Sequence, residues 1–432
     1  MNMPEQFKDF ITSGDKREIE YRSIKKRALI PSLTKEQVME DFECFKYILE
    51  NAYSGRDYFN EHVKSFDECY ASILDFINSR DNINIIDMMR IYYQTFEDVI
   101  FDAHFKFIAL DEVIEFYKHR NAYFTDIIIE KIAEKYIVAK SSIDEVKLND
   151  IITCSAENLF PTLAPKGREL YLYGVFTFDK PETVDIIVND NKLSIPVHRC
   201  RASEYTHPSN EYITHTVRDE INVVTMPTFV YNKNNYEKIA SSMYEHGEKL
   251  KNENAVIWNI MANGGGTTGY PGKFIEGLNE YSNYKNMIAV LHSHVIDSNY
   301  KSDDGKYYRE WEYWLNTQDD KTKAKFDGTL YVLINSGNAS SGEAAIDYAR
   351  NVKKCVTIGE NTMGCSTFGE TISYELPHTR MIMQVASKIF LVENFMEGEG
   401  FLPDYWVDSA DVLGETLKWL RDTRFSDAYI RL

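Results

Sequence analysis

Apolar residues recur at helical spacing through the first hundred positions of the chain. Thr34 and Gln37 are spaced as a capping box, and an apolar stripe follows them at Val38, Phe42, Phe45 and Leu49. A second stretch of this kind begins at Ser65, and residues 85–98 form a third. The pattern predicts an antiparallel helical cap over residues 1–98.

Between residues 99 and 118 the apolar positions alternate with polar ones. A period of two predicts a half-buried strand, which we assign to the first strand region of the core. Its polar face carries Asp102, His104 and Lys106. The imidazole of His104, beside a carboxylate on the same strand face, is a candidate general base.

Short β-rich segments separated by turn residues fill positions 119–203. The segment 183–199 contains two alternating runs joined by Asn-Asp-Asn, which predicts a hairpin. We therefore expect a small, mostly β module inserted into the chain.

From residue 204 to the end, apolar strand-like runs alternate with helical ones. This alternation is typical of a parallel sheet with crossover helices. The predicted strands are 221–227, 255–261, 286–292, 329–335 and 355–359, and the predicted helices are 232–250, 271–281 and 341–352. Strand-like pairs to about 392 and a helix near 411–421 follow, and the polar stretch 293–327 is expected to be a mobile excursion. The fold class is thus α/β.

Composition narrows the function classes. The 432 residues are 44% hydrophobic and carry a formal charge of −19, which excludes general disorder and disfavours nucleic acid or anionic lipid as a partner. We expect no membrane span, and no secretory signal is visible in the given chain, so a cytoplasmic location is expected unless a leader was removed. The six cysteines lack metal or disulfide spacing, and neither a cofactor nor a metal is predicted. The oligomeric state stays open.

A glycine run follows the predicted strand at 255–261. Asn263 and three successive glycines let the backbone approach a ligand and aim N–H groups at negative charge. Gly264, Gly266 and Gly269 also satisfy the dinucleotide fingerprint, but no acidic residue ends the next predicted strand. A phosphate-binding P-loop is excluded because Tyr270 stands where it needs lysine. A tight turn without a ligand is the remaining alternative.

A second small-residue turn places Ser340 where a helix begins, near N–H groups that stabilise an oxyanion. Ser340 and Glu343 are also spaced as a capping box, which most often does nothing more. The turn is not the GxSxG elbow of α/β-hydrolases. A serine nucleophile needs a base, and His104 is the histidine best placed by its strand face.

Four ordered segments together resemble the tail-specific, or carboxy-terminal processing, serine peptidase family. Its D-x-R-x-N-x-G-G is similar to residues 259–266, with the Asp and Arg replaced, and its A-S-A-x-E is similar to residues 339–343. Its G-E-x-T-x-G matches residues 359–364, and its G-x-x-P-D matches residues 400–404. The resemblance implies a ClpP/crotonase-like core, with the region 119–203 as a PDZ-like insertion and residues 1–98 as the helical cap.

The resemblance also implies a mechanism. The Ser-Lys dyad of the processing proteases is excluded, since Cys365 stands at the lysine position. The tricorn and interphotoreceptor retinoid-binding protein branch uses a D-x-H histidine and a glutamate before the final motif, which His104 and Glu397 match. A serine before that histidine in tricorn is Ala103 here. The oxyanion donors implied by the resemblance are the N–H groups of Gly265 and Ser341, while Glu343 is assigned to helix capping.

The leading interpretation is a serine endopeptidase acting on peptides or unstructured protein tails by acyl-enzyme chemistry. Ser340 would be the nucleophile, His104 the general base and Glu397 a residue that orients or polarises the relay. The alternative is an inactive pseudopeptidase that binds peptides or small apolar ligands, which the 24 Phe, 29 Tyr and 5 Trp residues would suit. Nucleotide binding at the glycine run is the third interpretation.

Overall fold

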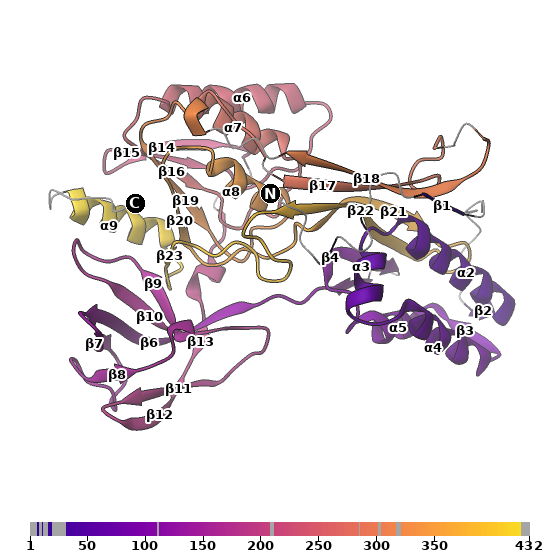
Figure 1. The fold of residues 1–432 in the computed structure, drawn as a ribbon, viewed down its shortest axis with the longest axis horizontal. Coiled ribbons are helices and arrows are strands. Elements are labelled where there is room, and N and C mark those ends of the chain that lie inside the picture. The colour runs from indigo at the N-terminus through magenta and orange to yellow at the C-terminus, as the bar shows by residue number, and fades with distance from the viewer. Residues whose placement is uncertain are drawn as a thin grey trace. The chain divides into compact units, whose positions relative to one another are not determined.

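A computed structural model describes residues 7, 11, 16–19, 32–109, 112–207, 211–284, 286–300, 304–316 and 321–424. The chain forms two compact units (Figure 1). The first comprises 1–118, 285–317 and 365–398, and the second comprises 119–284, 318–364 and 399–432. The predicted boundary after residue 118 falls between the units, whereas the predicted core over 204–432 contributes to both.

Four helices of the first unit lie within the predicted cap over residues 1–98. They are α2 (Lys35–Ala52), α3 (Gly55–His62), α4 (Phe66–Asn78) and α5 (Ile85–Phe96). The capping box is confirmed, because the Gln37 N–H donates to Thr34 Oγ1 at 3.4 Å and the Thr34 N–H donates to Gln37 Oε1 at 3.0 Å. The short α3 was not predicted from the sequence. A small ribbon of β2 (Ser32–Thr34) and β3 (Asn82–Asn84) links the starts of α2 and α5.

The sheet of the first unit is antiparallel. In spatial order its strands are β1 (Lys16–Glu18), β18 (Tyr308–Asn316), β17 (Asn286–Ser293), β22 (Ile382–Val392), β4 (Asp102–Ala109) and β5 (Glu112–Phe116), with β21 (Phe368–Glu375) also on β22. The prediction of a parallel strand at 286–292 is wrong, since β17 pairs antiparallel with β18 and β22. The polar stretch 293–327, expected to be an excursion, contains the nine-residue strand β18.

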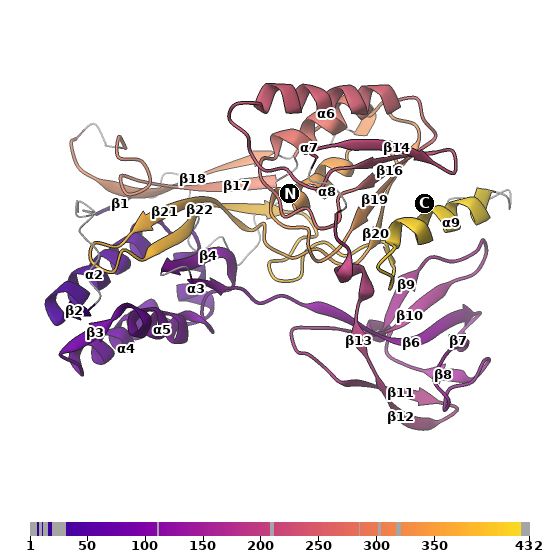
Figure 2. The ribbon, with the colours of Figure 1, turned by 180° about the vertical axis from the view of Figure 1, so that it is seen from behind.

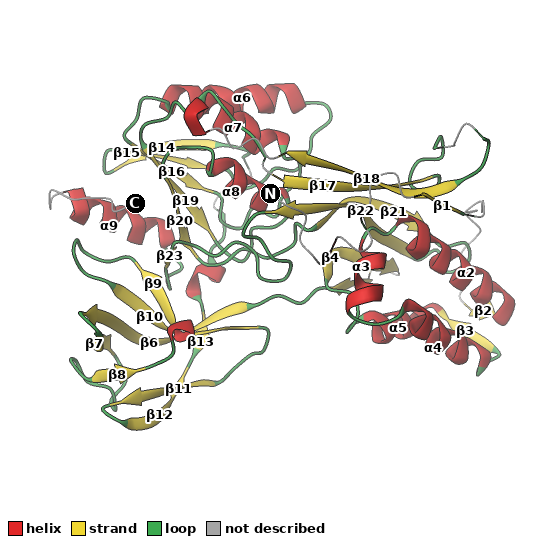
Figure 3. Cartoon of the chain, viewed as in Figure 1, coloured by secondary structure: helices red, strands yellow, loops and turns green. Residues whose placement is uncertain are grey.

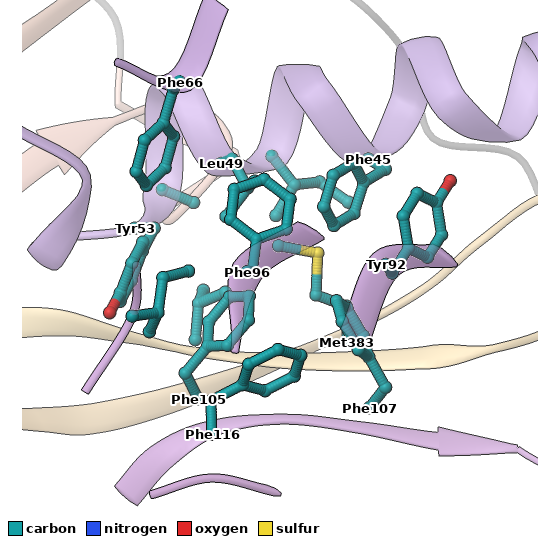
Figure 4. Packing of buried hydrophobic residues seen from close by; sticks show 14 of the residues in the cluster. Phe45, Leu49, Tyr53, Phe66, Tyr92, Phe96, Phe105, Phe107, Phe116 and Met383 are labelled. Atoms are coloured by element: carbon teal, nitrogen blue, oxygen red, sulfur yellow. The ribbon is translucent and has the colours of Figure 1, made fainter. Parts of the chain in front are cut away.

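An aromatic core joins the helices to this sheet (Figure 4). Phe45 of α2 stacks on Tyr92 of α5 with ring centroids 4.3 Å apart. Phe105 and Phe107 of β4 enter the same core and are fully buried. Because side chains alternate along a strand, His104 lies on the opposite face of β4.

The second unit contains the other four predicted parallel strands, in the order β15 (Ile221–Thr225), β16 (Ala255–Asn259), β19 (Thr329–Ile334) and β20 (Cys355–Gly359), and β23 (Tyr405–Trp406), which was not predicted, pairs parallel with β20. Its helices are α6 (Tyr236–Leu250), α7 (Gly269–Asn279), α8 (Ser341–Ala349) and α9 (Val412–Arg424). Helix α9 lies on one side of these strands, and α6, α7 and α8 lie on the other (Figure 2). Trp258 packs on Phe274 of α7 and Tyr331 on Trp419 of α9, so both faces are covered.

The inserted β module belongs to the same unit and contains strands and 3-10 turns only (Figure 3). Its strands are β6 (Asn121–Ile132), β7 (Lys135–Ser141), β8 (Ile151–Thr153), β9 (Leu159–Thr162), β10 (Leu170–Thr177), β11 (Thr183–Val188), β12 (Asn191–Pro196) and β13 (His198–Arg199). The hairpin β11–β12 is confirmed, and its turn residues Asn189 and Asp190 both have positive φ. Strand β9 of the module pairs with β23, so the module and the parallel strands form one sheet. Strand β14 (Thr214–Arg218) pairs with β15 in the same sheet.

None of the described helices is long and apolar enough to cross a membrane.

Candidate active site

Ser340 stands at the start of α8 with unusual backbone angles, φ 53° and ψ −120°. Non-glycine residues in such regions cost on the order of 1–3 kcal/mol and concentrate at functional sites. An ordinary helix N-cap has extended backbone instead. Capping alone therefore does not account for this conformation, which turns the serine sharply between β19 and α8.

The glycine loop touches Ser340. Gly265 has φ 98°, and a Cβ built on it would lie 3.0 Å from the Cβ of Ser340 and 2.9 Å from the Ser341 nitrogen. No larger residue fits that approach without displacing the serine turn. The second unit thus brings together Ser340, Ser341 and Gly265, three of the residues predicted for the site.

The backbone polar groups of Gly265 and Gly266 in the glycine loop have different partners. The Gly265 N–H, a predicted oxyanion donor, donates to Asn263 Oδ1 at 3.0 Å. Gly266 forms a parallel bridge with Phe229, through bonds made by its neighbours, so its own N–H and C=O point away from Phe229. Its C=O accepts from Ser341 Oγ at 2.8 Å. Gly266 is exposed, and its carbonyl lies on the Ser341 side, a placement that the sequence alone did not reveal.

Buried asparagines fix both loops. Asn335 Oδ1 accepts from the N–H groups of Ala262 at 2.7 Å and Gly337 at 3.1 Å. The Ala339 N–H donates to the Asn263 carbonyl at 3.1 Å, which ties the serine turn to the glycine loop. Asn335 was not predicted from the sequence, although its side chain accepts from two backbone N–H groups.

Glu343 does more than cap α8. Its side chain is fully buried, and Oε2 accepts from the Ser340 N–H at 3.3 Å, as the predicted capping box requires. Oε1 accepts from Thr362 Oγ1 and the Gly364 N–H, both at 2.6 Å. The carboxylate therefore connects the serine turn to the 362–364 segment, so Glu343 is a positioning residue.

His104 lies in the first unit on β4, with 18% of its side chain exposed. Asp102, completely buried, accepts from the His104 N–H at 2.7 Å and from the Tyr53 hydroxyl at 3.0 Å. His104 Nδ1 is 3.9 Å from Asp102 Oδ1, too far for a hydrogen bond, and it has no hydrogen-bond partner among the described residues. Asp102 thus holds the backbone of His104 rather than its ring, and Tyr53 is a contributor that the sequence did not reveal.

Burial sets the protonation of this pair. Desolvation, and secondarily the nearby Lys106 ammonium, lowers the pKa of the His104 imidazole to about 4. Burial raises the pKa of the Asp102 carboxyl to about 7 against the hydrogen bonds that it accepts. His104 is therefore neutral at pH 7, the form that a general base requires.

Glu397 contacts the segment that leads into β21. Its Oε2 accepts from the Ser366 N–H at 3.2 Å and from the Thr367 N–H at 2.8 Å. The Phe368 backbone, next along the chain, hydrogen-bonds the His104 imidazole and favours its charged form. Within the first unit, His104 and Glu397 thus converge on residues 366–368.

The predicted site residues fall into two groups. Ser340, Ser341 and Gly265 lie in the second unit, and His104 and Glu397 lie in the first. The roles assigned to them stay predictions. Cys365, at the lysine position of the processing proteases, is a buried cysteine that is not in a disulfide. Across the described residues, no cluster of three His, Cys, Asp or Glu side chains could hold a metal ion.

Comparisons with known proteins agree with the fold. Residues 220–407, slightly less than half of the chain, match the model of Peptidase family S41. No curated protein matches the sequence. The solved structure of mature CPAF is similar with a TM-score of 0.50 and 10% identity, covering 91% of this chain and 97% of that one.

Two further solved structures are similar at lower TM-scores. A putative peptidase from Parabacteroides merdae ATCC 43184 has a TM-score of 0.48 and 14% identity, covering 90% of this chain and 97% of its own. The photosystem II D1 C-terminal processing protease has a TM-score of 0.42 and 14% identity, covering 92% and 99%. The structure and its similarity to mature CPAF confirm the α/β fold, and the match to Peptidase family S41 confirms the serine-type peptidase class. The PDZ-like insertion and the histidine-dependent branch stay predictions.

Proposed function

We propose that this serine-type peptidase, identified by the match of residues 220–407 to family S41, is an endopeptidase that cleaves peptides or unstructured protein tails. Ser340 is the nucleophile and His104 is the general base. The observation that carries the proposal is the strained turn of Ser340, which packs against a glycine loop whose Gly266 carbonyl accepts from the Ser341 hydroxyl. Such an arrangement suits a serine hydroxyl that attacks a carbonyl carbon next to backbone N–H groups able to stabilise the oxyanion.

The reaction follows from these groups. Neutral His104 accepts the Ser340 hydroxyl proton while the oxygen attacks the scissile carbonyl carbon. The N–H groups of Gly266 and Ser341 stabilise the resulting oxyanion, with that of Gly265 available only if it leaves Asn263. The C–N bond then breaks as His104 returns the proton to the leaving amine, and water hydrolyses the acyl-enzyme by the same route. Glu397 orients the segment that contacts His104.

The pseudopeptidase remains the second candidate, and one observation favours it. A pKa of about 4 makes His104 a weak base, and its Nδ1 has no hydrogen bond that would fix the ring. A protein that retains the turn and the loop but lacks an efficient base would bind peptides without cleaving them.

The test is hydrolysis of a fluorogenic peptide library by the wild type and by Ser340→Ala. We expect Ser340→Ala to abolish cleavage while the protein stays folded, with a thermal unfolding midpoint lowered only by the loss of the N-cap hydroxyl, about 1 kcal/mol, whereas Ser242→Ala on α6 should behave as the wild type. Peptide binding with equal affinity to both proteins and no cleavage by either would establish the pseudopeptidase. Cleavage that survives in Ser340→Ala would remove Ser340 as the nucleophile.

A further inference from the structure

Glu360 is a buried carboxylate that the proposed mechanism does not use. It directly follows β20, its side chain is completely buried, and its backbone N–H donates to the Ile334 carbonyl, at the end of β19, at 3.1 Å. Its Oε2 accepts from the Ser336 N–H at 3.3 Å. The carboxylate therefore binds the short segment that connects β19 to Ser340.

Arg199, on β13 of the inserted β module, pairs with this carboxylate. Its Nε donates to Glu360 Oε1 at 3.3 Å, and its Nη2 donates to Ser336 Oγ at 3.0 Å. A planar guanidinium can make both contacts at once, whereas the ammonium of a lysine acts as a single point charge. Arg199 thus holds the side chain of Ser336, and the carboxylate that Arg199 pairs with holds the Ser336 backbone.

A second contact joins the same two segments. Asn335 Nδ2 donates at 2.9 Å to the carbonyl of Ala202, which follows Arg199 closely in the chain. The Asn335 N–H donates to Asn338 Oδ1 at 2.8 Å, and the Asn338 N–H donates to the Asn335 carbonyl at 2.9 Å. Residues 335–338 therefore form a closed turn that is bonded to the end of the module and is followed almost at once by Ser340.

Burial makes Glu360 dependent on its partners. Desolvation raises the pKa of the Glu360 carboxyl, while the Arg199 guanidinium and the hydrogen bonds from Ser336 favour the ionised form. Without the guanidinium, the carboxyl would be either charged without a cation beside it or protonated, and a protonated carboxyl accepts more weakly from the Ser336 N–H. Loss of Arg199 would therefore weaken both contacts that hold Ser336.

We propose that Arg199 is a positioning residue through which the inserted β module fixes the serine turn. Its guanidinium holds Ser336 and Glu360 in one arrangement, and the turn 335–338 connects that arrangement to Ser340. The proposal rests on the proposed nucleophile Ser340 and adds a residue that does not touch the reacting atoms. Because small displacements of a reacting group reduce its rate strongly, loss of this contact should reduce kcat more than it changes KM.

The experiment compares Arg199→Ala with Arg201→Ala in the full chain. Arg201 is the matched control, because it also lies at the end of the module but pairs with Asp408 and Asp126. Arg199→Ala should lower kcat for peptide hydrolysis, and the rate at which a fluorophosphonate modifies Ser340, by about 10- to 100-fold with little change in KM. Arg201→Ala should lower the thermal unfolding midpoint and keep both rates close to those of the wild type.

Rescue separates positioning from a loss of folding. Arg199→Lys restores the charge without the double contact, so its kcat should lie between those of Arg199→Ala and the wild type. Guanidinium ion, added far below its denaturing concentration, should raise the kcat of Arg199→Ala but not that of Arg201→Ala, because the Arg199 side chain is 34% exposed and solvent can reach its place. If Arg199→Ala does not fold, Arg199→Lys decides alone.

Three results would overturn the proposal. A wild-type kcat in Arg199→Ala or in Arg199→Lys would show that the serine turn does not depend on this guanidinium. An equal loss of kcat in Arg201→Ala would assign the effect to general loosening of the module. Either result would leave the peptidase intact, whereas a wild type that neither cleaves peptides nor is modified at Ser340 would overturn the nucleophile and the positioning role together.

Discussion

The predicted site residues have different surroundings in the two units. The serine unit uses backbone: a strained residue, glycines that allow close approach, and buried amides that hold N–H groups in place. The histidine unit uses titratable side chains, of which Asp102 is completely buried and His104 is partly buried. The first arrangement depends on shape and the second on protonation. Substitutions in the histidine unit should therefore change the pH dependence of activity or stability, whereas substitutions in the serine unit should change activity or stability at every pH.

The largest effect is expected from removing the base. His104→Gln should lower kcat/KM for peptide hydrolysis by about 10²- to 10⁴-fold, because Gln cannot accept the hydroxyl proton. His292 is a partly exposed histidine on β17 of the same unit, and His292→Gln should leave kcat/KM unchanged. Steady-state kinetics of both variants would decide it, and equal activity in His104→Gln and the wild type would assign the base elsewhere.

Glu343→Gln tests the shape of the serine unit. Three donors converge on this carboxylate, and an amide offers one acceptor oxygen only, so at least one donor loses its partner at about 1–3 kcal/mol. We expect a lower denaturation midpoint and a kcat reduced by about 10- to 100-fold, with the same pH profile. The exposed Glu415→Gln on α9 serves as control. A changed acidic limb would contradict a purely positioning role.

Asp102→Asn tests the protonation of the histidine unit. The pKa of Asp102 is raised to about 7 in the folded state, so the native protein binds more protons than the unfolded chain between about pH 4 and 7. This group makes the wild type less stable as pH rises through that window. Asn does not titrate, so Asp102→Asn should not show this fall in stability. Relative to the wild type, the variant should become more stable by on the order of 1 kcal/mol for each pH unit of rise within that window.

Urea unfolding from pH 4 to 7 measures this difference. In the wild type, the contribution of His104 to the pH dependence of stability is opposite in sign to that of Asp102. The lowered pKa of His104 makes the stability rise with pH between about 4 and 6.5. The wild-type curve should therefore be nearly flat where the curve of Asp102→Asn rises. Parallel curves for the two proteins would show that Asp102 is ionised in the native state throughout this range.

The smallest effect concerns Lys106. With the pKa of His104 at about 4, the acidic limb of kcat/KM should lie well below the ordinary histidine value of about 6.5. Lys106→Gln removes a charge that disfavours the imidazolium, so the limb should move to higher pH by less than about one unit. A wild-type limb near 6.5 would contradict the buried, neutral imidazole.

Much of the fold and of the candidate site could be predicted from local sequence patterns. The capping box at Thr34, the strand that carries His104 and the parallel strands around Ser340 follow from periodicity and motif order. The pairing of β17 was missed, since a continuous apolar run looks the same in a parallel or an antiparallel sheet. The roles of Gly266 and Glu343 depend on which partner a polar group faces, which spacing does not encode.

The central claim is that Ser340 is a nucleophile activated by His104. The most direct measurement is the rate at which a fluorophosphonate probe modifies the wild type and His104→Gln, with the modified residue located by peptide mapping. We predict modification of Ser340 alone, slowed by about 10²-fold or more in His104→Gln. Modification of another residue, or an equal rate in both proteins, would contradict the claim.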